Sequence, residues 1–294
     1  MILRRFVVVT NFQMINSPRL FSSFYFFLSL VVYQALTFCN IRALSPPCVI
    51  TGEYFLNHKS RGYHPECPER ISGCLAMLED LKINGQIDLR KIDSESNTLD
   101  ALATINKVHC PKYVERVRSL SNRGAHRLSA TDEDTYINSY SFNQTLLAQL
   151  AWMHGVDHVI QTKGMAFSAS RPPGHHATFD ESMGFCIFNF AVGAAMYAIE
   201  RYNINRIGII DFDVHYGNGV ADLIKSSTKI RYTSIHELGI FPLGRGSTQE
   251  TGDHGNILNI PLKYGAKFDV YEKLLREKAI PFIEDFQPEL VIIW

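Results

Sequence analysis

The sequence predicts a single α/β domain in which helices cover both faces of a mostly parallel β-sheet. Short β-rich apolar segments alternate with segments of helical periodicity, and no internal repeat, low-complexity run or long Gly/Ser linker divides the chain. The composition agrees, because 294 residues with 46% apolar and 20% charged content are typical of a soluble protein with a sizeable core. This composition excludes disordered and fibrous classes.

The elements follow from the periodicity of the apolar residues. Four segments with apolar residues at helical spacing are expected to form helices: Pro68–Ile83, Ser141–Ile160, Ile187–Tyr202 and Phe268–Asp285. Five short apolar runs are expected to form strands: Met165–Ala169, Arg206–Phe212, Lys229–Ile235, Ile257–Ile260 and Leu290–Trp294. Strands that alternate with helices of this length typically pair in parallel.

Polar side chains follow three of these strands. The strand at 165–169 leads to His175 and His176, the strand at 206–212 leads to Asp213 and His215, and the strand at 229–235 leads to His236. Ligands of open parallel sheets bind beyond the carboxyl ends of the strands. We therefore expect these side chains to meet at one rim.

The D-x-D-x-H segment at 211–215 is the first candidate site. Side chains two apart on an extended segment share a face, so Asp211, Asp213 and His215 are expected to project together while Phe212 and Val214 point into packing. A carboxylate and an imidazole that converge suit zinc. The pattern alone is equally compatible with a capped strand end and a surface histidine.

The second candidate is the loop RPPGHHA at 171–177. Two prolines fix its backbone and Gly174 permits a close turn, so we expect the adjacent histidines to be held rigidly. Histidine suits proton transfer because its ordinary pKa is near neutral. The alternatives are further metal ligands or solvated loop residues. The rigid frame favours catalysis.

A third candidate joins two aromatic loops, Gly184-Phe185 and the segment around Phe241. If both loops reach the same rim, the two rings can form a narrow apolar slot for an alkyl chain. Ordinary core phenylalanines are an equally good explanation in a chain with 19 of them.

Together these segments resemble the histone deacetylase superfamily of zinc amidohydrolases. Five motifs occur in the order of that family: HPECPER (64–70), RPPGHHA (171–177), GFCIFN (184–189), IIDFDVHYGNG (209–219) and SIHELGIFPLGRG (234–246). The resemblance covers about residues 47–294 and implies a three-layer arginase/deacetylase-like fold. Asn218 stands where class I members have Asp, which is similar to the class II and acetylpolyamine amidohydrolase branch.

The resemblance implies a zinc-dependent deacetylase site. It makes Asp213 and His215 two of three zinc ligands, His176 the general base that acts on the zinc-bound water, and His175 a neighbour that stabilises charge in the transition state. The resemblance also pairs Asp211 with His175 and Asn218 with His176. It implies that the acyl-lysine tunnel is lined by Gly184, Phe185 and Phe241, and that Arg70 lies near an internal acetate-release cavity. It further implies a structural K⁺ site formed by Asp211, Asp213, His215, Ser234 and Ile235.

The sequence departs from the family pattern after the strand at 290–294. The family's third zinc ligand follows that strand in an SAGxD-like loop, and its transition-state tyrosine lies in a later GGY loop; neither motif is in these 294 residues. We therefore expect a truncated catalytic domain whose full product is active. The alternatives are a catalytically inactive deacetylase-like binding protein and a binuclear ureohydrolase, which is disfavoured because Gly217 stands where a second bridging carboxylate is needed.

The first part of the chain has a different chemistry. Residues 1–52 contain four arginines and no acidic residue, which leaves 25 basic against 29 acidic residues in the rest. Residues 20–39 carry no charge. We therefore expect residues 1–46 to be a targeting segment for an organelle or the secretory route, or, if the segment is not cleaved, a membrane anchor at residues 20–39. The catalytic domain is then expected at 47–294, with the cytoplasm or nucleus as the alternative location.

The mildly acidic body indicates no direct binding of nucleic acid. We expect the substrate to be a non-histone acetyl-lysine or a small acetylated amine such as a polyamine. The sequence does not indicate an oligomeric state.

Overall fold

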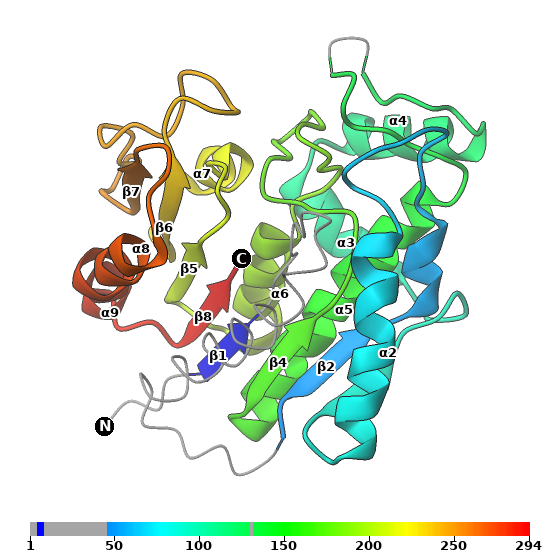
Figure 1. The fold of residues 1–294 in the computed structure, drawn as a ribbon, viewed down its shortest axis with the longest axis horizontal. Helices are drawn as coiled ribbons and strands as arrows, with labels where there is room; N and C mark the ends of the chain where they lie inside the picture. Colours follow the sequence, from blue (N-terminus) through cyan, green and yellow to red (C-terminus); the bar gives the residue numbers. More distant parts are fainter. Residues whose placement is uncertain (1–4, 9–45, 130–131) are drawn as a thin grey trace.

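The computed structural model describes residues 5–8, 46–129 and 132–294, and their strands form one sheet (Figure 1). The strand order is β3-β2-β4-β1-β8-β5-β6-β7, and all neighbours are parallel. The strands are β1 (Arg5–Val8), β2 (Cys48–Thr51), β3 (Asp88–Lys91), β4 (Met165–Ser168), β5 (Ile207–Asp211), β6 (Ile230–Glu237), β7 (Ile257–Leu262) and β8 (Leu290–Ile293).

Helices connect the strands, as parallel pairing requires. They are α2 (Glu69–Ile83), α3 (Leu99–Val108), α4 (Pro111–Asn122), α5 (Ser141–Thr162), α6 (Phe190–Tyr202), α7 (Asn218–Ile224), α8 (Phe268–Leu274) and α9 (Ile280–Asp285), with a 3-10 turn at Glu53–Asn57 and a π-helical turn at Leu275–Ala279 between α8 and α9. No helix within the described ranges is long and apolar enough to cross a membrane.

The sheet has apolar contacts on both faces, and successive side chains of β5 point to opposite faces. Ile209 belongs to the large core that also contains Trp152 of α5, whereas Ile210 packs with Ile283 of α9 on the opposite face. A second small cluster joins Ile235 of β6 to the segment between α8 and α9. All five residues of β5 are buried, as expected for a parallel strand covered on both sides.

The predicted fold class is confirmed, with corrections at the level of elements. The expected helix at 187–202 begins at Phe190, because the side chain of Asn189 caps it by accepting a hydrogen bond from the Val192 N–H at 3.2 Å. The expected helix at 268–285 is interrupted by the π-helical turn. Elements β2, β3, α3, α4 and α7 were not predicted.

The centre of the sheet contains a further unpredicted strand. β1 pairs with β4 on one side, with Phe6 opposite Met165, and with β8 on the other, with Phe6 opposite Val291. The sheet therefore does not begin near Pro47, because a strand from the leading segment lies within it. The predicted targeting or anchor segment at 20–39 lies outside the described residues.

Candidate active site

The loop after β4 carries the two adjacent histidines in a buried frame. His175 and His176 are each 2% exposed. Arg171, at the start of the loop, is buried as well, and its guanidinium donates to both carboxylate oxygens of Glu66 at 2.8 and 2.7 Å. This buried ion pair fixes the loop to the HPECPER segment, which sequence reasoning missed because the two residues are 105 positions apart.

His175 is paired with Asp211 at the end of β5. Its Nδ1 lies 3.0 Å from Asp211 Oδ2, and the Tyr232 hydroxyl donates to the same oxygen at 2.8 Å. Burial would lower the pKa of His175, but the Asp211 carboxylate outweighs it and the pKa is raised. A Cβ on Gly217 would lie 2.3 Å from Asp211 Oδ2, so only glycine fits beside this pair.

His176 is paired with Asn218 instead of a carboxylate. Its Nδ1 lies 2.8 Å from Asn218 Oδ1, and since the amide oxygen can only accept, Nδ1 carries the hydrogen. Nε2 is then the basic nitrogen. Burial and the neighbouring His175 lower the pKa of His176 well below its usual value, so the ring is neutral at pH 7.

The zinc-ligand candidates Asp213 and His215 lie beyond the end of β5. The strand ends at Asp211, and the Asp213 N–H donates to Asp211 Oδ1 and the His215 N–H to Asp213 Oδ1, at 3.1 and 2.8 Å. The expectation of an extended segment with Val214 in the interior was wrong, because these side chain-to-backbone hydrogen bonds turn the chain and leave Val214 48% exposed.

Asp213 and His215 fit a zinc ion as part of a ligand set. Asp213 Oδ1 and His215 Nδ1 are 3.0 Å apart, and carboxylate oxygen and imidazole nitrogen are both ordinary zinc ligands. Burial would raise the pKa of Asp213, but the hydrogen bond from His215 and the nearby His175 hold it below its usual range. Among the described residues, no third His, Cys, Asp or Glu completes a group of ligand atoms here.

The loops that carry Phe241 and Gly184 contact the catalytic histidine candidates. The Phe241 ring is 40% exposed and lies edge-on to His176 and His215, with centroids at 4.9 and 6.4 Å. A Cβ on Gly184 would lie 2.5 Å from His176 and 2.7 Å from Phe241, so glycine permits this approach. Phe185 packs edge-on against His64 at 4.8 Å.

The remaining predicted positions lie in the buried layer below the site. Ser234 pairs in register with Asp211 across β5 and β6, and Ile235 follows it; both are fully buried. The Ser234 hydroxyl hydrogen-bonds His236 Nδ1 at 2.9 Å. Arg70 donates to Glu66 at 3.0 Å and therefore belongs to the Glu66–Arg171 network.

Two aromatic residues complete the site and were not predicted. Tyr232 on β6 bonds Asp211, and the Trp294 ring stacks on His175 with centroids 5.3 Å apart and planes at 15°. Trp294 also stacks on Trp152 of α5 at 5.1 Å. Its place as the last residue of the expected strand Leu290–Trp294 is the signal that could have located it at the rim.

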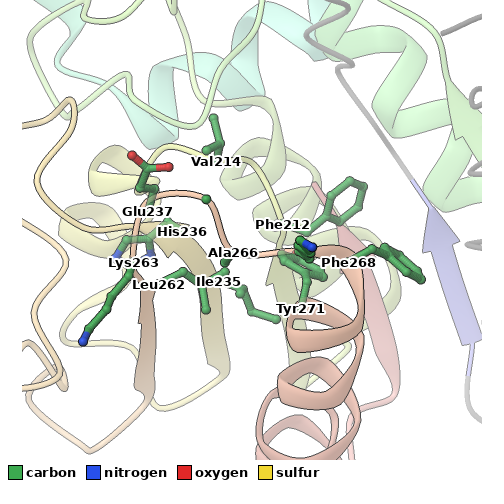
Figure 2. A pocket seen from close by; sticks show the side chains of 12 residues that line it. Phe212, Val214, Ile235, His236, Glu237, Leu262, Lys263, Ala266, Phe268 and Tyr271 are labelled. Carbon is green, nitrogen blue, oxygen red and sulfur yellow. The ribbon is translucent and has the colours of Figure 1, made fainter. Parts of the chain in front are cut away.

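A cavity of about 310 Å³ lies beside the turn at 212–214 (Figure 2). Phe212, Val214 and Tyr271 of α8 line it, and no residue of the histidine loop does. The Tyr271 hydroxyl is buried and has no hydrogen-bond partner within the described part of the chain. This cavity is therefore separate from the histidine pair.

The parallel sheet and the histidine pair beside a D-x-H turn define an arginase/deacetylase-like α/β protein. The comparison with protein families then identifies the particular group. Residues 64–294 match the histone deacetylase domain, and the chain belongs to this family.

Similar proteins agree with this assignment. A histone deacetylase-like amidohydrolase of Pseudomonas aeruginosa is 30% identical over 78% of this chain and 60% of its own length. The chloroplastic histone deacetylase 10 of rice (Oryza sativa subsp. japonica) is 31% identical over 78% of this chain and 55% of its own length. The crystal structure of the HDA15 HD domain superposes with a TM-score of 0.72 at 28% identity, covering 83% of this chain and 72% of that one. The chain thus spans little more than half the length of these two curated relatives.

Proposed function

We propose that this protein hydrolyses an acetyl amide in a zinc-dependent reaction. The observation that carries the proposal is His176: a buried, neutral imidazole whose Nδ1 is held by Asn218, placed beside the Asp213–His215 pair. Membership in the deacetylase family supports hydrolysis in general.

Asp213 and His215 would hold the zinc ion, which when bound polarises a carbonyl and makes water a better nucleophile. His176 Nε2 accepts a proton from the attacking water, because the ring is neutral and its other nitrogen is bonded to Asn218. Asp211 raises the pKa of His175 and so favours its protonated form, which would stabilise the negative charge that develops on the acetyl oxygen.

The apolar rim supports an acyl-lysine or acylated amine substrate. Phe241 and Gly184 border His176, and an alkyl chain laid against the exposed Phe241 ring would direct its amide toward the two histidines. We propose Phe185 as the second wall and Asp211, Ser234 and Ile235 as part of a K⁺ site beneath it, which the burial of all three residues supports.

We propose a non-histone acetyl-lysine or a small acetylated amine as the substrate and an organelle as the compartment. The relatives named as chloroplastic support this location. Imaging of a carboxyl-terminal fluorescent fusion tests it, and an exclusively nuclear signal would contradict it.

The activity test compares the protein with its His176→Ala variant after zinc loading. We expect acetate release from an acetyl-lysine peptide or an acetylpolyamine, and a fall in kcat of about 10²–10⁴-fold in the variant because the general base is lost. His154→Ala is the matched control, since His154 is an exposed histidine on α5. Stoichiometric zinc without any hydrolysis would instead support a non-catalytic binding protein.

A further inference from the structure

Three side chains with metal-ligating atoms meet at the end of the sheet opposite the histidine pair. Cys48 and Asp88 are the first residues of β2 and β3, and His158 lies near the end of α5. The candidate active site lies beyond the carboxyl ends of β4 and β5, whereas these residues lie at the amino ends of neighbouring strands. The cluster therefore belongs to a different site.

The fold brings the three groups together by backbone pairing and helix packing. Cys48 is directly opposite Asp88 in the parallel register of β2 and β3, and α5 packs against β2 (Figure 1). One ligand atom from each of the three side chains lies within 4.8 Å of the other two. A single ion can therefore reach a sulfur, an oxygen and a nitrogen at this point.

His158 is buried and incompletely hydrogen-bonded. It is 6% exposed, and its Nε2 has no hydrogen-bond partner among the described residues. Burial lowers its pKa, so the ring is neutral, and because a guanidinium only donates, Nδ1 accepts from Arg90 while Nε2 carries the hydrogen. When Arg90 turns away, the lone pair on Nδ1, or on Nε2 after a change of tautomer, is free to bind a metal.

Arg90 is the group that competes with a cation here. Its guanidinium contacts Asp88 Oδ2 at 2.8 Å and His158 Nδ1 at 3.3 Å. The Arg90 side chain is 52% exposed, and ion pairs at such positions contribute little to stability. It can therefore leave Asp88 to a cation by turning into solvent.

We propose that Cys48, Asp88 and His158 form a second binding site, for a divalent cation of the zinc type. Thiolate, imidazole and carboxylate are the three ligand types that zinc takes in proteins. On binding, the Cys48 S–H bond is replaced by a sulfur–metal bond and the thiol proton is released to solvent. The bound ion would link β2, β3 and α5 and replace Arg90 as the partner of Asp88.

The test is a titration of the purified, metal-free full chain with Co²⁺, followed by absorption spectroscopy. A cobalt–thiolate bond gives a charge-transfer band in the near ultraviolet, which carboxylate and imidazole ligands do not give. We expect this band to saturate at one equivalent and to disappear when Zn²⁺ is added. Cys48→Ser abolishes it, whereas Cys74→Ser, which changes a thiol outside the cluster, leaves it intact.

Two further variants distinguish this site from adventitious binding. His158→Gln is expected to weaken Co²⁺ binding by roughly tenfold or more, as loss of metal-site partners commonly does. Arg90→Met removes the competing cation and should tighten binding several-fold. Asp213→Asn should leave the thiolate band unchanged, since that carboxylate is at the other end of the sheet. Absence of the band, or a band that persists in Cys48→Ser, would overturn the proposal.

Discussion

At the residue scale, the two adjacent histidines differ in pKa because the side chain that binds each Nδ1 differs in charge. Asp211 presents a carboxylate to His175 and raises its pKa, whereas Asn218 presents an amide oxygen to His176, whose pKa burial lowers. A carboxylate and an amide have nearly the same shape, so charge and not geometry separates the two rings. A pair of imidazoles whose pKa values are moved in opposite directions suits an acid and a base.

Asn218→Asp tests this division. A carboxylate at 218 is expected to raise the pKa of His176, because an opposite charge favours the protonated ring. Since the base must be neutral, activity is lost as pH falls through the pKa of His176, and the acid limb of kcat/KM should move to higher pH. Asn203→Asp, at the exposed end of α6, is the control. An unshifted acid limb would contradict the assignment of His176.

Gly217→Ala tests the space beside Asp211. The new methyl group would lie 2.3 Å from Asp211 Oδ2 and 2.4 Å from the Tyr232 hydroxyl, so the hydrogen bonds that orient His175 cannot survive unchanged. We expect loss of activity and destabilisation of about 1–3 kcal/mol from overpacking. Gly73→Ala in α2 has open space around it and should stabilise the protein by about 0.5–1 kcal/mol. Urea unfolding of both variants measures the contrast.

At the element scale, the loop that carries the histidines is held by another loop rather than by its own strand. Glu66 accepts from Arg171 and Arg70, and from the Tyr136 hydroxyl at 2.6 Å, and all of its side chain is buried. His58 stacks on Tyr136 at 4.3 Å. The network thus ties together segments that the sequence separates by many residues, which periodicity and spacing do not reveal.

The same reason explains which elements were predictable. A strand such as β5 at 207–211 is a nearly continuous apolar run and can be predicted from the sequence, whereas β3 has only Leu89 buried among charged residues. The site residues at 175–176 and 211–218 were predictable because motif spacing places them at strand ends. Tyr232, Glu66 and Trp294 were not singled out, since their roles depend on which elements become neighbours in space.

Glu66→Gln tests the network between the loops. Burial alone would raise the pKa of Glu66, but Arg171, His58 and Arg70 outweigh it and lower the pKa to about 2. The ion pair therefore contributes stability that is present above the unfolded value of about 4.3 and is lost as pH falls toward 2. The variant leaves Arg171 buried without a counter-charge and should lose about 3 kcal/mol at pH 7.

Urea unfolding at pH 7 and at pH 3 is the measurement for this variant. The stability difference between wild type and Glu66→Gln is expected to shrink at pH 3, because Glu66 of the unfolded wild type, with a pKa of about 4.3, is already protonated there while the folded carboxylate stays charged down to about pH 2. Glu115→Gln, in an exposed pair with Arg118, should unfold like the wild type at both pH values. A difference that is equal at pH 7 and pH 3 would argue against the ion pair as its cause.

At the scale of the whole molecule, the sheet depends on a strand from the first residues of the chain. β1 occupies the position between β4 and β8, and with it the two halves of the sheet form one layer (Figure 1). β4 leads into the histidine loop, and β5, the neighbour of β8, leads into the D-x-H turn. The distance between the histidine loop and the D-x-H turn therefore depends on the pairing of β1 with β4 and with β8.

Val7→Pro tests this arrangement. Val7 pairs with Ala166 of β4 and with Ile292 of β8, and proline cannot donate a ladder hydrogen bond and is excluded from central strands. We expect a clear fall in the free energy of unfolding, of about 2–3 kcal/mol, together with weaker activity in the complete protein because both catalytic loops depend on the sheet. Val7→Ala keeps the backbone N–H and should cost far less. If the two variants unfold alike, β1 does not support the sheet in solution.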